Sequence, residues 1–281
     1  MKFGINLVCF PNLNDRWTPD FYIQCASLAE ESGWDGVFIW DHIWAYWEGE
    51  SPTFDPWILL AGMASHTDEV RLGPMVTPLA RRRPWKLARE TVTLDHLSDG
   101  RLILGIGLGG EAKEFSLFGE DANPIVRAEK LDEALTILKG LWTGKPFQFR
   151  GTHYQLEEVT FTPPPIQKPR IPIWVAGYYP NTKPFQRAAE FEGVFPTAEW
   201  GVDFSPSELE QVLRIIQRYR SNLDQFDVVV SPNPLTDENE LCESIRKWAE
   251  AGATWWLDIL SSWRGSASQI LRRIEQGPPD L

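Results

Sequence analysis

The sequence predicts one α/β domain over residues 1–281, built as a single (β/α)8 TIM barrel. Strand patterns and helix patterns alternate along the whole chain without a break in composition. The predicted strands are near-continuous apolar runs, as expected for parallel strands that are buried on both faces. About eight such units fit a closed barrel, which commonly takes about 250 residues. The main alternative is an open, doubly wound sheet.

The first part of the chain supplies four strand–helix units. Thr18 has the position of an N-cap and Pro19 follows it, so a helix begins here, and its pattern stops at Gly33. Pro84 opens another amphipathic helix, which a turn at 98–100 ends. The predicted strands are 2–8, 36–40, 70–76 and 101–110, and the predicted helices are 18–33, 56–65, 84–97 and 126–142.

An irregular excursion at 143–170 separates the fourth helix from the fifth strand. Aromatic residues on both sides of Gly151 predict a small hairpin, and three prolines at 163–165 then exclude regular structure. Further along, Ser205 and Glu208 have the spacing of a capping box. The remaining predicted strands are 171–177, 193–196, 226–230 and 254–260, and the remaining helices begin near 184, 205, 236 and 266.

Composition excludes several classes of function. A net charge of -12 argues against a nucleic-acid or anionic-membrane partner. We expect no signal peptide and no membrane span, because no apolar run approaches the ~20 residues that a span requires. Three distant cysteines fit reduced thiols in a cytoplasmic protein. Histidine and cysteine spacings show no metal motif, so no metal site is expected.

A glycine-rich stretch, residues 105–110, ends the fourth predicted strand. It satisfies G-x-G-x-x-G, but no long helix follows directly and no acidic strand end stands about 20 residues on, so the dinucleotide fingerprint fails. We interpret the glycines as letting backbone N–H groups approach an anion, most simply a phosphate. A tight turn without a ligand is the alternative.

Four segments resemble the bacterial luciferase-like family of flavin-dependent oxidoreductases. The resemblance is dense up to Gly110, continues to about residue 193 and is weak beyond. The segments are AEESGWDGVFIWDH at 29–42, RLGPMVTP at 71–78, LARETVTLDHLSDGRLILGIGLGG at 87–110 and PIWVAG at 172–177. The resemblance implies a barrel that binds FMN, or the deazaflavin coenzyme F420, at the mouth formed by the C-terminal ends of the strands.

The same resemblance implies which residues hold the cofactor. An irregular backbone with a non-proline cis bond would support the flavin ring, and loops after two later strands would hold the phosphate. The ring support maps to Met75, Val76 and Thr77. The phosphate loops map to Gly107, Leu108 and Gly109 and to Gly177, Tyr178 and Tyr179.

Candidate catalytic residues end the second predicted strand. His42 has an intrinsic pKa suited to acid–base work near neutrality, and Asp41 precedes it. The alternative is that both residues only hold the mouth together. Four tryptophans surround this pair and suit an apolar or planar substrate, namely Trp40, Trp44, Trp47 and Trp57. Arginines at 81–83 could bind an anionic group, but such a run is more typical of a solvated face.

These observations leave several functions open. An FMN enzyme would use reduced flavin and oxygen on a small organic substrate, with a partner flavin reductase, whereas an F420 enzyme would transfer a hydride with His42 as acid or base. A glycoside hydrolase would need two facing carboxylates, drawn from Glu111, Glu114, Glu199 and Asp258. A flavin-binding barrel without turnover is the third alternative. We expect a homodimer, and the sequence does not indicate the substrate.

Overall fold

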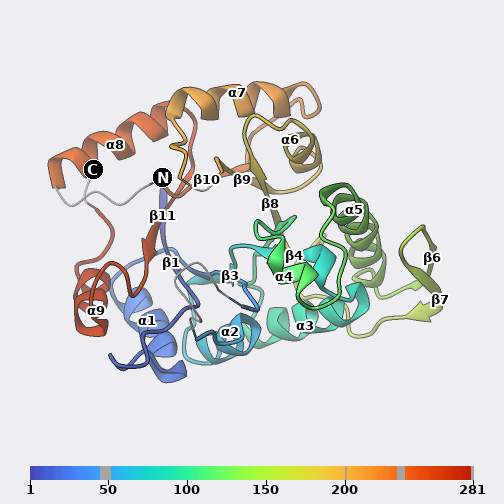
Figure 1. Ribbon diagram of the computed structural model, residues 1–281, viewed down its shortest axis with the longest axis horizontal. Coiled ribbons are helices and arrows are strands. Elements are labelled where there is room, and N and C mark those ends of the chain that lie inside the picture. Colours follow the sequence, from blue (N-terminus) through green and yellow to red (C-terminus); the bar gives the residue numbers. More distant parts are fainter. Residues whose placement is uncertain (45–51, 200, 233–237, 280–281) are drawn as a thin grey trace.

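A ring of parallel strands forms the centre of the molecule, and the predicted barrel is confirmed (Figure 1). The computed structural model describes residues 1–44, 52–199, 201–232 and 238–279. The sheet order is β3-β2-β1-β11-β10-β9-β8-β5-β4. The strands are β1 (Lys2–Leu7), β2 (Gly36–Ile39), β3 (Arg71–Pro74), β4 (Thr77–Pro78), β5 (Leu104–Gly107), β8 (Ile173–Tyr178), β9 (Gly193–Thr197), β10 (Asp227–Val230) and β11 (Trp255–Leu260).

Two strands differ clearly from their predictions, because β5 is shorter than the predicted 101–110 and the run at 70–76 is interrupted. The Met75–Val76 peptide is cis, as the resemblance implies, and it divides the run into β3 and β4. β3 pairs with β2, whereas β4 pairs with β5. A bridge between Leu72 and Leu102 joins β3 to the segment before β5, so the ring of strands closes.

The helices begin at the capping residues that the sequence indicates. Thr18 accepts a hydrogen bond from the amide of Phe21, and Ser205 and Glu208 form the predicted capping box. The predicted helix start at Thr236 lies outside the described residues. The helices are α1 (Pro19–Glu31), α2 (Pro56–Ala64), η1 (Leu79–Arg81), α3 (Pro84–Leu97), α4 (Lys113–Ser116), α5 (Pro124–Leu141), α6 (Lys183–Ala188), α7 (Pro206–Gln217), α8 (Glu238–Glu250) and α9 (Ala267–Glu275). Among the helices that the structure describes, none is long and apolar enough to cross a membrane.

Large aromatic rings fill the inside of the barrel. The ring centroids of Phe38 and Trp174 are 5.2 Å apart, as are those of Trp174 and Trp255. Both indole N–H groups donate to the carboxylate of Asp227, at the start of β10. Gly36 makes room for this cluster, because a Cβ there would lie 2.8 Å from the Phe38 ring. The interior is therefore packed, and any ligand has to bind at an end of the barrel.

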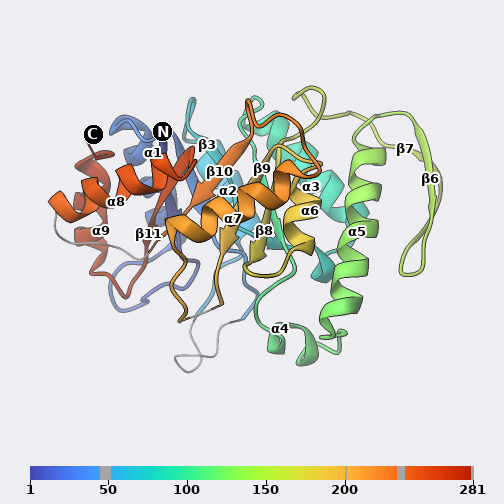
Figure 2. The ribbon, with the colours of Figure 1, turned by 90° about the horizontal axis from the view of Figure 1, so that it is seen from above.

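The excursion after α5 is a hairpin of β6 (Pro146–Arg150) and β7 (Gln155–Thr160), as predicted. The carboxylate of Glu133 on α5 accepts the backbone amides of Thr152, His153 and Tyr154, which fastens the hairpin tip to the helix. Figure 2 shows the hairpin at one edge of the molecule and α4 on the side where loops leave the strands. The hairpin therefore lies away from the mouth.

Candidate active site at the mouth of the barrel

Asp41, directly after β2, is the centre of a buried charge network. Its carboxylate accepts hydrogen bonds from the Thr77 hydroxyl at 2.8 Å and from the Trp57 indole at 3.1 Å. Arg81 and Arg82 both reach it, at 2.8 and 2.7 Å. All of these partners are side chains of the protein, and Asp41 is only 2 % exposed. Asp41 therefore fastens β2 to β4, α2 and η1, which favours the supporting role among the two interpretations of the sequence.

The arginine run after β4 is not a solvated face, so this interpretation was wrong for two of its members. The side chains of Arg81 and Arg82 are 5 % and 20 % exposed, because the carboxylate of Asp41 lies between them and compensates their charge. Arg82 also lies over the ring of Trp57. Sequence reasoning missed this because Asp41 is 40 residues away from Arg81 along the chain.

Glu114, on the short helix α4, is the second buried carboxylate at the mouth. Its Oε1 accepts the backbone amides of Ile43 and Trp44 and lies 3.2 Å from Nη1 of Arg81. Its Oε2 lies 2.9 Å from Nδ1 of His42. Burial by itself raises the pKa of Glu114, but the hydrogen bond to His42 and the nearby Arg81 outweigh it and hold this pKa below its usual value. Glu114 is therefore ionised near neutrality.

His42 lies between this carboxylate and aromatic rings. Its ring centroid is 5.2 Å from that of Phe10 and 5.8 Å from that of Trp40. The side chain is 21 % exposed, so molecules at the mouth can reach the imidazole. A histidine oriented by a carboxylate is a suitable acid or base, since the carboxylate fixes the tautomer and stabilises the protonated ring.

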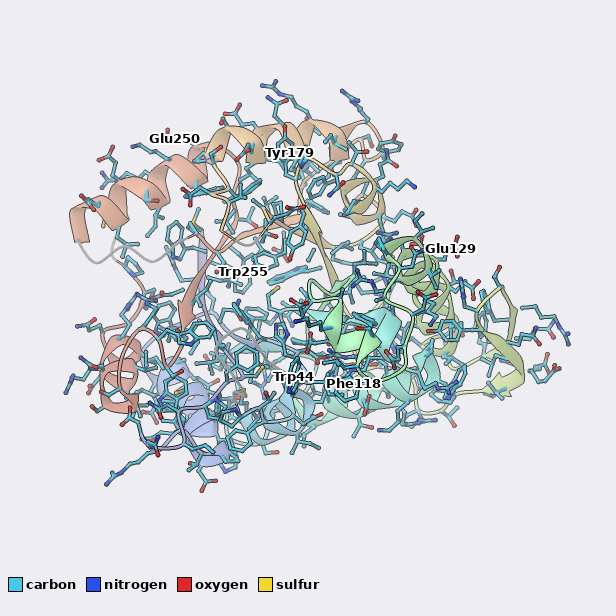
Figure 3. The ribbon with its side chains drawn as sticks, in the orientation of Figure 1. Trp44, Phe118, Glu129, Tyr179, Glu250 and Trp255 are labelled. Carbon is cyan, nitrogen blue, oxygen red and sulfur yellow. The ribbon has the colours of Figure 1, made fainter. Side chains whose placement is uncertain are left out.

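Figure 3 labels Trp44 and Phe118 near α4, and the amide of Trp44 donates to Glu114 on this helix. Trp40 and Trp44 belong to the mouth, while Trp57 supports Asp41 from α2. Trp47 lies outside the described residues. The aromatic surroundings of His42 also include Phe10, which was not among the predicted site residues because it follows a different strand.

The residues that the resemblance assigns to the cofactor lie on adjacent strands. Three residues are assigned to the support of the flavin ring. Met75 is buried in the barrel interior and Thr77 is buried with its hydroxyl bonded to Asp41, whereas Val76 is partly exposed. Val76 also meets the next strand, because a Cβ on Gly107 would lie 2.7 Å from Cγ2 of Val76. The glycine is therefore required by this close packing, whatever else binds there.

The loop after β5 presents backbone donors. Within the described part of the chain, the amides of Leu108, Gly109 and Gly110 donate to no protein acceptor. Gly109 has φ +85°, a conformation that favours glycine. Arg127 on α5 donates to the carbonyl of Gly109 at 2.8 Å, which turns the carbonyl side of the loop toward the helix. Consecutive unpaired amides of this kind are suited to an anionic group.

The loop after β8 makes several contacts within the protein. A Cβ on Gly177 would lie 2.3 Å from Cβ of Pro184, so this glycine allows α6 to pack against the strand. The amide of Tyr179 donates to the carbonyl of Thr197. Tyr178, in contrast, places its hydroxyl over Gly110. Burial, with Glu199 and Glu111 nearby, raises the pKa of Tyr178, so its hydroxyl stays protonated and able to donate.

Two of the four acids considered for a glycoside hydrolase are already paired with other side chains. Asp258 is bonded to Arg264 and Arg273, and Glu114 is held by His42 and Arg81. Glu199 is exposed and Glu111 half-buried. Among the residues described, no cluster of three or more histidines, cysteines or acids is arranged to hold a metal ion.

Comparisons with known proteins identify the family of this chain. A family model described as luciferase-like monooxygenase matches residues 1–258. The F420-dependent glucose-6-phosphate dehydrogenase of Microbacterium testaceum is 31% identical over 250 residues, which are 86% of this chain and 72% of that protein. The oxygenase component of the flavin-dependent trigonelline monooxygenase of Acinetobacter baylyi is 27% identical over 289 residues, 99% of this chain and 74% of that one.

Solved structures share the fold at lower identity. An F420-dependent secondary alcohol dehydrogenase, in complex with an F420-acetone adduct, superposes with a TM-score of 0.81 at 17% identity and covers 99% of this chain and 98% of its own. The monooxygenase RslO1 from Streptomyces bottropensis superposes with a TM-score of 0.79 at 21% identity, covering 98% and 97%. Both likenesses concern the fold alone.

Proposed function

The chain belongs to the luciferase-like monooxygenase family, and from this premise we propose that it is an F420-dependent dehydrogenase that oxidises a hydroxyl group of a small organic substrate. The observation that carries the proposal is the pair of His42 and Glu114, 2.9 Å apart at the mouth. Oxidation of an alcohol requires a base for the hydroxyl proton, and this pair supplies one. The F420-dependent dehydrogenases among the relatives of this chain support the choice.

The residues present fit the cofactor that the family implies. The amides of Leu108, Gly109 and Gly110 provide donors for its phosphate, and the Tyr178 hydroxyl lies over the same loop. Val76, at the break between β3 and β4, offers an apolar surface for its ring. The remaining proposed cofactor residues act through packing or backbone position. They are Met75, Thr77, Gly107, Gly177 and Tyr179. When bound, the deazaflavin supplies two-electron chemistry, accepting a hydride from the substrate.

The protein side of the reaction follows from the network. His42 takes the proton of the substrate hydroxyl onto its imidazole, while Glu114 stabilises the resulting positive charge. Arg81 and the amides of Ile43 and Trp44 hold Glu114 in place. Asp41 anchors the strand end that carries His42 and takes no part in proton transfer. In the reverse direction, the protonated His42 acts as the acid.

A cofactor titration tests the proposal. Purified protein is titrated with F420 and, separately, with FMN, and binding is followed by fluorescence. We expect F420 to show saturable binding and to bind at least about tenfold more tightly than FMN. Binding of FMN alone contradicts the dehydrogenase proposal, and binding of neither contradicts both candidate functions.

A second candidate function is an FMN monooxygenase. The likeness to an oxygenase component over 99% of the chain favours it. In that case a separate flavin reductase would supply reduced FMN, and the aromatic residues at the mouth would keep water from the reactive flavin. Oxygen uptake that depends on both reduced FMN and an organic substrate would distinguish this function from F420-dependent oxidation under anaerobic conditions.

We further propose that the protein acts as a homodimer in the cytoplasm. Cys9 and Cys25 are buried thiols that form no disulfide, which fits a reducing compartment. Light scattering after size-exclusion chromatography tests the oligomeric state, because a monomer of 32.1 kDa and its dimer are well separated. A monomer across the working concentration range contradicts the dimer.

A further inference from the structure

An aromatic wall, defined as Phe10, Trp40 and Trp263, lines the mouth beside His42. The three rings come from the segments after β1, β2 and β11, and their centroids are 6.3 to 6.5 Å apart. They are tilted against one another, at interplanar angles of 49° to 88°, so they pack together and leave no cage between them. Phe10 is buried, whereas Trp40 is half-buried and Trp263 exposed, so the two tryptophans offer the apolar surface of the wall.

Exposed apolar side chains continue this surface around the rim of the mouth. They come from the segments after five strands, and each is between 41 % and 63 % exposed. Large apolar side chains gathered at one end of a protein indicate a ligand or partner of the same character. This apolar rim consists of Leu13, Ile43, Leu117, Phe118, Val202 and Trp263.

Positive charge is scarce on the side of the mouth that carries the wall. Within the described residues, the segments after β2, β9 and β10 (40–44, 52–55, 198–199, 201–205 and 231–232) contain no lysine or arginine but four acids. The segment after β11 contains Arg264, which is bonded to Asp258. The segment after β1 contains Arg16, which is exposed. Nearer His42, Arg81 and its neighbour are compensated by Asp41 and Glu114.

We propose that the substrate is an uncharged organic molecule with a flat apolar face that lies against the aromatic wall, and that phosphorylated sugars and other anions are excluded. This inference rests on the proposed function and names the substrate class for the same site. A phosphate or carboxylate on the substrate would lose its hydration beside the wall, where Arg81 and Arg82 are already paired with Asp41 and Glu114, and this costs free energy. A ring face against tryptophan gains apolar contact instead.

Matched ligands test the substrate class. 1-Phenylethanol, its para-carboxylate 4-(1-hydroxyethyl)benzoate and glucose 6-phosphate are titrated by calorimetry into protein loaded with its cofactor and, in parallel, into protein without it. We expect 1-phenylethanol to bind at least about tenfold more tightly than the carboxylate, and glucose 6-phosphate to show no saturable binding at millimolar concentration. Equal or tighter binding of either anion, or no binding of 1-phenylethanol, overturns the inference.

Variants of the wall localise the binding. Trp263→Ala is expected to weaken 1-phenylethanol binding about tenfold, which corresponds to about 1.4 kcal/mol, while Trp263→Phe stays within about threefold of the unaltered protein. Tyr219→Ala is the matched control, since Tyr219 is 61 % exposed but follows α7, at the other end of the barrel. Equal effects of the alanine variants at 263 and 219, or none at 263, overturn the inference.

The two proposals can fail separately. Cofactor titration reports on the proposed function without any substrate, whereas the ligand preference is measured in cofactor-free protein as well. If the protein binds neither cofactor but still prefers 1-phenylethanol, the proposed function fails and the wall remains a binding surface for this class. If the protein binds F420 but prefers glucose 6-phosphate, the proposed function stands and the substrate inference fails.

Discussion

Arg81 places Nη1 3.2 Å from Oε1 of Glu114, although Arg81 lies in η1 and Glu114 on α4. The other terminal nitrogen of the same guanidinium lies 2.8 Å from Oδ1 of Asp41. One arginine therefore joins the carboxylate that anchors the strand end to the carboxylate that orients His42. Both carboxylates are almost fully buried, so the loss of this link leaves charge uncompensated.

Arg81→Gln is expected to lower kcat by about tenfold or more and to raise KM by a smaller factor, because Glu114 loses its fixed position beside His42. Arg82→Gln is the matched control, since the side chain of Arg82 donates its hydrogen bonds to the carboxylate of Asp41. Both variants should lose stability in thermal unfolding. Equal kcat values for the two variants would contradict the positioning role of Arg81.

His42→Ala is expected to reduce kcat/KM by about 10²–10⁴-fold, the usual contribution of a general acid or base. The affinity for the cofactor, measured by titration, should stay unchanged, because the proposed cofactor residues lie on other strands. Glu114→Gln should show a smaller loss of the same kind. His153→Ala serves as control, since His153 lies in the hairpin and pairs with Glu129 on α5. Unaltered turnover in the His42 variant would exclude its catalytic role.

Gly109→Ala is expected to weaken cofactor binding about tenfold, because alanine disfavours φ +85° and its methyl would lie 2.9 Å from the Phe115 ring. Gly119→Ala is the control, because it strains the backbone without crowding the loop after β5. Gly119 has φ +74°, and an added methyl there would meet nothing within 4 Å, so this variant should lose stability but keep cofactor affinity. Parallel losses of affinity in both variants would argue against a cofactor role for the loop after β5.

Glu30 predicts a pH-dependent contribution to stability. Burial raises the pKa of Glu30, but hydrogen bonds from the amides of Val70, Glu69 and Asp68 outweigh it and lower this pKa from 4.5. The folded state therefore prefers the carboxylate, so the contribution is present above pH 4.5 and is lost as the pH falls below it. The contribution belongs to the contact between α1 and the segment before β3.

Glu30→Gln should accordingly lower the free energy of unfolding by about 1–2 kcal/mol at pH 7 and by less at pH 3, as measured by urea denaturation. Glu31→Gln, at the exposed neighbouring position on α1, is the control and should change stability little at either pH. An equal effect of Glu30→Gln at the two pH values would contradict a charge-dependent contribution.

Local patterns predicted most of the fold. Thr18 and Ser205 are N-caps as expected, because the hydrogen bonds of a cap join residues three apart in the chain. Apolar runs predicted each barrel strand, since parallel strands are buried on both faces. The run at 70–76 was predicted as one strand, and its division into two strands that pair with different neighbours depends on partners from β2 and β5.

The candidate site was predicted only in part. His42 is at the mouth as expected, but its partner Glu114 was considered for a different chemistry, and Arg81 was assigned to a solvated face. Arg127, which holds the carbonyl of Gly109, was not considered at all. The sequence did indicate that Arg81 and Glu114 lie in the same region, because both follow strands whose ends meet at the same mouth. Their pairing, however, could not be read from spacing.

The sequence by itself determined the alternation of strands and helices, the caps, the hairpin and the family, because these depend on neighbouring residues and on recurring motifs. Only the tertiary structure decided how Asp41 and Glu114 divide their roles. A buried charge needs a compensating partner, and the barrel brings that partner from a distant strand end. The sequence pattern thus assigns Arg81 to a solvated face, whereas in the folded protein its buried guanidinium links two carboxylates.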